Sequence, residues 1–257
     1  MSCSVTPRNH RGTGGHKEGL VSPGVAVHGM FERIAPTYDI VNRILSFGRD
    51  ASWRRKLAEA VETDRKIDLL DVATGTGEVL VSILRRRPNV QKAVGIDICE
   101  NMLALCRRKI AARPFSRRTC LRRADAARTG LAGGAFDVAT MAFGIRNVAD
   151  PLGVLNEIHR LLRPGGAVLV LEFSLPSGRI GRTLYLAYLR RLVPLVGAVI
   201  SRDRTAYGYL NRTIESFARN CDLPGLLRQA GFQNIRSSPL TGGIVTLYQA
   251  RKPTPRQ

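Results

Sequence analysis

From residue 67 onward, apolar runs of strand length alternate with stretches of helical periodicity. Strand patterns cover residues 67–73, 92–97, 136–142 and 166–173, with further candidates at 118–123 (a weak pattern), 232–238 and 243–250. Residues 100–112 and 151–162 repeat apolar positions at helical spacing. Strands joined through helices predict βαβ crossovers, whereas the short link "PLTGG" predicts a closing antiparallel hairpin. The pattern therefore predicts an α/β fold with a seven-stranded, mostly parallel sheet.

Two segments depart from this alternation. Residues 28–62 predict an N-terminal helical arm, in which we expect Pro36 to divide the first helical pattern into two short helices. Residues 179–220 are apolar, aromatic and basic at once, which indicates inserted helices. These helices either form a lid over the core or present an amphipathic surface to a greasy substrate or a membrane.

The net charge of the chain is more informative about its partners than its apolar content. The chain carries 40 Lys+Arg against 20 Asp+Glu, a net charge of +20. A strongly positive field attracts phosphates of nucleic acid or lipid, although arginine enrichment across a whole proteome would give the same composition. Residues 1–27 and 253–257 read as tails, the first of them basic and disordered, around one domain at 28–252.

Cysteine and histidine usage argues against a disulfide framework and a metal site. The five cysteines contain no C-x-x-C pair, and the four histidines have no ligand spacing. No secretory signal and no run of 18 apolar residues is visible, so we expect a cytoplasmic protein without a membrane span or a metal.

The first strand pattern ends in "DVATGTG", where Gly75 and Gly77 flank Thr76. Glycines after a strand permit a sharp turn and the close approach of a ligand. A dinucleotide motif would place a third glycine at position 80, which is Leu80, and the loop is not a P-loop. The segment therefore favours a ligand without a pyrophosphate.

Acidic residues occur at three successive strand ends. Asp71 lies in the first strand pattern, Asp97 ends the second, and Asp125 follows the third. An acid at the second position is suited to a ribose diol, and Asp125 to an adenine amino group. Each acid alone is equally typical of a helix cap. As a series they predict a nucleoside crevice that suits S-adenosylmethionine better than NAD.

Four stretches carry a resemblance to a known family. They are "YDIVNRILSFGRDASW" (38–53), "FGIRNVADP" (143–151), "LLRPGGAVLVLEFS" (161–174) and "LTGGIVTLY" (240–248). With them the chain resembles the class I S-adenosylmethionine-dependent methyltransferases, and more narrowly the menaquinone/ubiquinone biosynthesis C-methyltransferases, over residues 28–252. It departs from the family pattern at Asp50, where a histidine is usual, and at Val41, where methionine is common.

The resemblance implies a Rossmann-like domain that methylates a ring carbon of a polyprenylated quinol. It implies that Arg146 stabilises a phenolate, since arginine cannot act as a base at neutral pH. Asn147 either orients a water or caps the next helix, and Glu172 and Ser174 either line the crevice or bond a neighbouring loop. The implied catalytic residues are Tyr38, Asp39, Asn42 and Arg146. The implied cofactor residues are Asp71, Gly75, Thr76, Gly77, Asp97, Asp125, Ala126 and Ala142.

The resemblance leans toward demethylmenaquinol, with the benzoquinol of ubiquinone biosynthesis as the alternative. The basic charge and residues 183–200 predict peripheral contact with an anionic membrane at the inner face of the cell membrane, and a homodimer is left open. An RNA methyltransferase is a competing reading because of the charge, but the chain has no amino-methylating N/D-P-P-[YF] motif, and we expect no nucleic-acid partner. A cofactor-binding protein without turnover is a third reading, prompted by Asp50.

Overall fold

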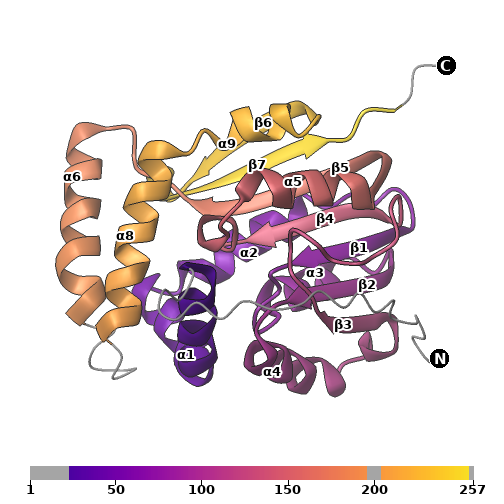
Figure 1. Ribbon diagram of the computed structural model, residues 1–257, viewed down its shortest axis with the longest axis horizontal. Coiled ribbons are helices and arrows are strands. Elements are labelled where there is room, and N and C mark those ends of the chain that lie inside the picture. Colours follow the sequence, from indigo (N-terminus) through magenta and orange to yellow (C-terminus); the bar gives the residue numbers. More distant parts are fainter. Residues whose placement is uncertain (1–22, 196–203, 255–257) are drawn as a thin grey trace, which may run out of the picture.

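The structure is a computed structural model that describes residues 23–195 and 204–254. A seven-stranded sheet with the order β3-β2-β1-β4-β5-β7-β6 forms its centre (Figure 1). All neighbours from β3 to β5 are parallel, and β7 pairs antiparallel with both β5 and β6. The predicted sheet and hairpin are thereby confirmed. The strands are β1 (Ile67–Val72), β2 (Val90–Asp97), β3 (Thr119–Arg123), β4 (Phe136–Ala142), β5 (Leu162–Phe173), β6 (Gln233–Leu240) and β7 (Val245–Arg251).

Helices cover both faces of the sheet. Leu69 and Leu70 of β1 point to opposite faces and belong to two different apolar clusters, as the period of a strand requires. The cluster around Leu69 includes α2 (Arg49–Glu59), α3 (Glu78–Arg86) and α4 (Glu100–Ala111). The cluster around Leu70 includes α5 (Pro151–Leu161) and α9 (Leu223–Gln229). A 3₁₀ turn, η1 (Ser116–Arg118), precedes β3.

The first helix, α1 (Pro23–Leu45), runs without interruption through Pro36, so the expected division into two helices is wrong. Proline removes the bond that its N–H would give to the carbonyl four residues earlier, here that of Glu32. The Glu32 carbonyl instead accepts from Asn101 Nδ2 of α4 at 3.2 Å. The helix begins inside the stretch that the sequence suggested as a tail, and the rest of that tail, residues 1–22, lies outside the described residues.

The expected inserted helices are present as α6 (Arg179–Ala187), the short π-helical segment η3 (Tyr188–Leu192) and α8 (Arg204–Asn220). They lie beside one another and beside α1, beyond the sheet (Figure 1). Buried residues of α1, α6, η3 and α8 form a separate apolar cluster that also packs against Phe173 at the end of β5. None of the helices in the described ranges is long and apolar enough to cross a membrane.

Candidate active site

The predicted cofactor residues lie at one edge of the sheet, where four neighbouring parallel strands end. The segment Gly75–Gly77 follows β1, Asp97 ends β2, and Ala142 ends β4. Asp125 and Ala126 follow β3. β3, β2, β1 and β4 are adjacent in that order. The residues that the sequence placed at successive strand ends therefore lie along one continuous edge of the sheet. We call residues 75–77 the cofactor loop.

Asp97 is tied directly to the cofactor loop. Its Oδ2 accepts from the backbone N–H of Gly75 at 2.8 Å, and its Oδ1 accepts from the N–H of Cys99 at 2.9 Å. The carboxylate thus joins the loop to the start of α4, at the place where the sequence predicts a ribose contact. That contact stays a prediction.

Asp71 lies beneath the loop and is buried. Its Oδ2 accepts from Thr74 Oγ1 at 2.6 Å and its Oδ1 accepts from Thr140 Oγ1 at 2.6 Å. Burial raises the pKa of Asp71 to about 6, although the hydrogen bonds from Thr140 and Thr74 work in the opposite direction. Both oxygens therefore hold neighbouring protein groups, and the predicted role of Asp71 toward the cofactor is untested.

The cofactor loop is tightly packed on one side and open on the other. A Cβ on Gly77, which has φ +83°, would lie 2.3 Å from Cys106 Sγ of α4. A Cβ on Gly75 would meet no atom within 4 Å. This open side, with Asp97 beside it and the small Ala126 and Ala142 at neighbouring strand ends, stays the predicted place of the adenosine of S-adenosylmethionine.

A cavity of 410 Å³ lies between α1, α2, α6, α8 and the ends of β4 and β5. Trp53, Phe143 and Phe173 line it as an aromatic cluster with ring centroids 4.7 to 6.2 Å apart. Trp53 is fixed by a hydrogen bond from its Nε1 to Thr241 Oγ1 at 2.8 Å, in the turn η4 (Thr241–Gly243). The wall suits a ligand with an aromatic ring and an apolar chain.

Arg146 lines this cavity from the turn η2 (Ile145–Asn147) after β4. Its NH1 donates to Glu172 Oε1 at 2.7 Å and to the carbonyl of Phe143 at 2.7 Å, and its guanidinium lies 5.1 Å from the centre of the Phe173 ring. The side chains of Arg146 and Glu172 are 3% and 0% exposed. Among the described atoms, Arg146 Nε is buried without a hydrogen-bond acceptor. Glu172 thus bonds the neighbouring turn, the alternative that the sequence left open.

Tyr38 and Asn42 face the same cavity as Arg146, one helical turn apart on α1. Burial raises the pKa of Tyr38, partly opposed by the positive charge of Arg146 and by a hydrogen bond with Asn42. Asn147 does not cap the next helix, because the cap of α5 is Asp150. Its Nδ2 donates to the Phe143 carbonyl at 3.3 Å.

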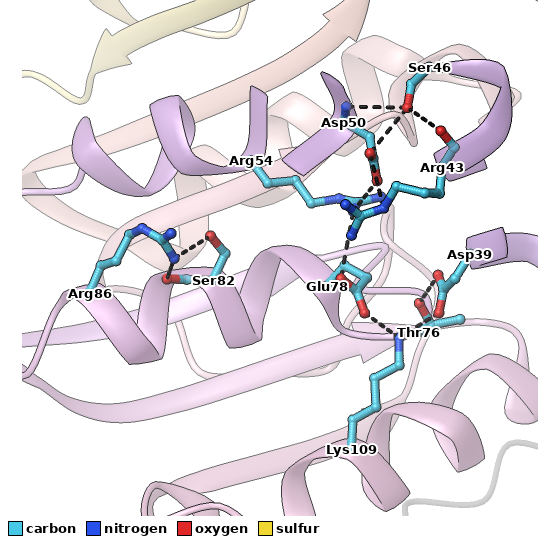
Figure 2. A network of polar contacts seen from close by, with 10 residues as sticks. All are labelled: Asp39, Arg43, Ser46, Asp50, Arg54, Thr76, Glu78, Ser82, Arg86 and Lys109. Atoms are coloured by element: carbon cyan, nitrogen blue, oxygen red, sulfur yellow. Dashed lines mark hydrogen bonds and ion pairs between the residues drawn. The ribbon is translucent and has the colours of Figure 1, made fainter. Parts of the chain in front are cut away.

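Asp39, the fourth predicted catalytic residue, is directed away from this group. Its Oδ1 accepts from Thr76 Oγ1 of the cofactor loop at 2.6 Å, and its Oδ2 accepts from Lys109 Nζ of α4 at 2.5 Å (Figure 2). The structure therefore places Asp39 at the cofactor loop, and Tyr38 and Asn42 at the cavity. Sequence reasoning did not find Lys109, since no motif around it signals a contact with α1.

Asp50, which replaces the usual histidine, is buried at the start of α2. Its Oδ2 accepts from Arg54 NH1 at 2.6 Å and its Oδ1 from Ser46 Oγ at 3.1 Å, with Arg43 Nε at 3.5 Å (Figure 2). The carboxylate is thus held between two guanidinium groups, an arrangement suited to fixing α1 against α2.

The fold and this edge define the class of protein. A mostly parallel seven-stranded sheet, a glycine loop after β1 and an acid at the end of β2 are those of a class I S-adenosylmethionine-dependent methyltransferase. The family model of the ubiE/COQ5 methyltransferase family matches residues 20–252. The chain belongs to this family, as the sequence resemblance predicted, and its cofactor is S-adenosylmethionine.

Curated relatives extend over nearly the whole chain. The ubiquinone/menaquinone biosynthesis C-methyltransferase UbiE of Syntrophotalea carbinolica is 41% identical over 233 residues, which are 91% of this chain and 97% of that protein. The demethylmenaquinone methyltransferase of Thermus thermophilus is 39% identical over 87% of this chain and 100% of its own length.

Solved structures share the fold. A SAM-dependent methyltransferase from Thermotoga maritima gives a TM-score of 0.58 at 18% identity, over 88% of this chain and 99% of that one. The Haemonchus contortus phosphoethanolamine N-methyltransferase 2, solved with S-adenosyl-L-methionine, gives 0.59 at 15% identity, over 92% of this chain and 61% of that one.

Proposed function

We propose that this methyltransferase transfers the methyl group of S-adenosylmethionine to a ring carbon of a polyprenylated quinol, and that the quinol is demethylmenaquinol. The observation that carries the proposal is the guanidinium group of Arg146, a cation in the wall of an aromatic, largely apolar cavity. A quinol oxygen in the cavity would lie against this guanidinium, and the aromatic wall would hold the ring. The curated relatives named for menaquinone biosynthesis support the choice of ring.

The chemistry requires a carbon nucleophile. A quinol carbon becomes electron-rich when a ring hydroxyl loses its proton, because the phenolate charge spreads onto the ring. The Arg146 guanidinium stabilises that phenolate, and Tyr38 and Asn42 orient it from α1. When bound, S-adenosylmethionine supplies the electrophilic methyl group. As the new carbon–carbon bond forms, the bond between the methyl carbon and the sulfonium sulfur would break and leave a neutral thioether. The ring carbon then loses its own proton to water and the ring oxygen regains the proton that it gave up, so that aromaticity is restored and one proton is released overall.

The test is methyl transfer from labelled S-adenosylmethionine to reduced short-chain demethylmenaquinol, to the demethylated benzoquinol of ubiquinone biosynthesis, and to RNA. We expect label in the naphthoquinol product, and about 100-fold slower turnover for Arg146→Ala with unchanged cofactor binding. Label only in benzoquinol would move the protein to the ubiquinone branch, and label only in RNA would overturn the quinol proposal. Cofactor binding without transfer to any acceptor would favour a protein without turnover.

We also propose that the mouth of the cavity rests on the anionic inner face of the cell membrane, which supports a cytoplasmic location. Phe47 and Leu184 line the cavity and are 80% and 67% exposed, and Ile180 beside them is 79% exposed. The surrounding segments 40–49 and 179–195 carry six arginines and no acidic residue, while Arg43 and Arg190 face the carboxylates of Asp50 and Glu215 outside these segments. An exposed apolar rim on an arginine-rich stretch of chain suits anionic lipid.

Vesicle flotation tests this contact. We expect binding to vesicles with phosphatidylglycerol and little binding to neutral vesicles, with loss of binding in Phe47→Ser/Leu184→Ser. The matched control is Ile98→Ser, since Ile98 is 47% exposed but lies outside both segments. Equal binding by the double variant would contradict the proposal. A light-scattering measurement of mass would decide the homodimer, which stays a prediction.

A further inference from the structure

Polar contacts connect four helices around the cofactor loop (Figure 2). Lys109 Nζ of α4 donates to Asp39 Oδ2 of α1 at 2.5 Å and to Glu78 Oε1 of α3 at 2.6 Å. Asp39 also accepts from Thr76, and Glu78 directly follows Gly77 in the chain. One ammonium group therefore bridges two carboxylates, one on the N-terminal arm and one at the end of the cofactor loop.

The two carboxylates need this cation. The side chains of Lys109, Asp39 and Glu78 are 29%, 33% and 35% exposed, so their charges are partly shielded from water. Without Lys109, the carboxylates of Asp39 and Glu78 would face each other with no cation between them. Their repulsion would push α1 away from the cofactor loop. Arg54 of α2 does not replace the ammonium, because its NH1 lies 3.6 Å from Glu78 and 2.6 Å from Asp50.

The same helix that Lys109 holds also forms the wall of the cavity. Tyr38 and Asn42 flank Asp39 in α1 and line the cavity. In its first half, α1 is attached independently, because the Glu32 carboxylate accepts from the backbone N–H groups of Glu100 and Asn101 at the start of α4. Lys109 therefore acts on the later part of α1, where the cofactor loop and the cavity wall meet.

We propose that Lys109 is a positioning residue that couples the two binding sites. A ligand that orders the cofactor loop fixes Thr76, and Thr76 and Lys109 together fix Asp39 and the cavity-forming half of α1. By linkage, seating α1 must strengthen binding at the loop by the same factor. The inference rests on the proposed function in one respect: it takes the cavity that Tyr38 and Asn42 of α1 line as the quinol site.

Hydrogen exchange of the amides of residues 37–45 tests the coupling, with and without S-adenosylhomocysteine. In the native chain we expect this ligand to slow exchange in α1. In Lys109→Met we expect the slowing to disappear and the ligand to bind roughly 10-fold more weakly, equivalent to about 1.4 kcal/mol. Lys109→Arg keeps a cation and should restore most of both effects.

The matched control is Arg107→Met, on the same helix. Arg107 pairs with Glu100 at 2.5 Å, both side chains are about half exposed, and the pair does not reach the cofactor loop. If Lys109→Met fails to fold, Asp39→Asn removes the ion pair from the other side without creating a repulsion, and should reduce both effects in the same direction. The proposal is overturned if ligand-dependent protection persists in Lys109→Met, if it is absent in the native chain, or if it is lost equally in Arg107→Met. Because no quinol is present, these outcomes are independent of the substrate assignment.

Discussion

Replacing Gly77 with alanine should destabilise the protein, mainly through a steric clash between the added Cβ and Cys106. Gly77 is buried, caps α3 with φ 83° and ψ 13°, and faces α4 so closely that a Cβ would lie 2.3 Å from Cys106 Sγ and 3.3 Å from Cys106 Cβ. Cys106 is 0% exposed in the core between α3, α4 and the sheet. The sulfur has no open space to move into without displacing its neighbours.

The magnitude follows from two contributions. Alanine in the left-handed region costs about 1–2 kcal/mol, and overpacking a core contact costs about 1–3 kcal/mol. The free energy of unfolding of Gly77→Ala should thus fall by about 2–5 kcal/mol. Cys106→Ala removes the atom at 2.3 Å but leaves the Cβ at 3.3 Å. In the Cys106→Ala variant the steric clash is therefore largely relieved. There we expect Gly77→Ala to lower the free energy of unfolding by roughly 1–2 kcal/mol, the backbone contribution alone.

Urea unfolding of the four members of this double-mutant cycle provides the assay. Trp53 is the single tryptophan, and it is buried in the aromatic cluster, so its fluorescence reports unfolding. The expected coupling between the two substitutions is about 1–3 kcal/mol. A coupling below roughly 0.5 kcal/mol, within the additivity of independent sites, would refute the close packing of the cofactor loop on α4.

Three other substitutions test the edge and the cavity. Asp97→Ala should weaken S-adenosylhomocysteine binding roughly 10- to 100-fold by calorimetry, because a charged hydrogen-bond acceptor is lost; unchanged affinity would refute the nucleoside assignment. Arg146→Lys keeps the charge but not the planar donors, so kcat should fall while the cofactor affinity holds. Burial raises the folded-state pKa of Asp71 to about 6, above the ordinary value of a carboxyl group. Its protonated form therefore stabilises the native state at low pH, and that stability is lost as the pH rises from about 4 to 6. Asp71→Asn should remove this loss, measured as urea midpoints across that range.

Strand-end chemistry was predictable from the sequence because it is local. An apolar run, a glycine pair and an acid can be recognised within one short stretch of sequence. Parallel strands then bring their carboxyl ends to the same edge of the sheet, so no long-range contact has to be known. The weak strand pattern at 118–123 is also confirmed, as β3 at the edge of the sheet, where exposed positions blur the apolar pattern. The predicted hairpin followed from the length of its connection alone.

Long-range contacts explain what local patterns missed. Pro36 predicts a helix break only if the Glu32 carbonyl has no other donor, and that donor, Asn101, comes from another helix. Tyr38 and Asp39 are neighbours in the sequence, but α1 directs them to different sites, which became visible only once α4 supplied Lys109. Neither outcome is encoded within a window of ten or fifteen residues.

Backbone strain shows that the cavity is imposed by the fold and not by local preference. Within residues 23–195 and 204–254, five non-glycine residues have positive φ, and three of them, Phe47, Phe143 and Thr241, line the cavity. Such conformations cost of order 1–3 kcal/mol each and persist only where the surroundings over-determine them. At Phe143, with φ 56°, the carbonyl accepts from both Arg146 and Asn147. The turn after β4 therefore places the guanidinium and the aromatic wall together, directly after the strand end where the cofactor edge finishes. We expect that relaxing this strained turn would move the cavity wall and the end of β4 together.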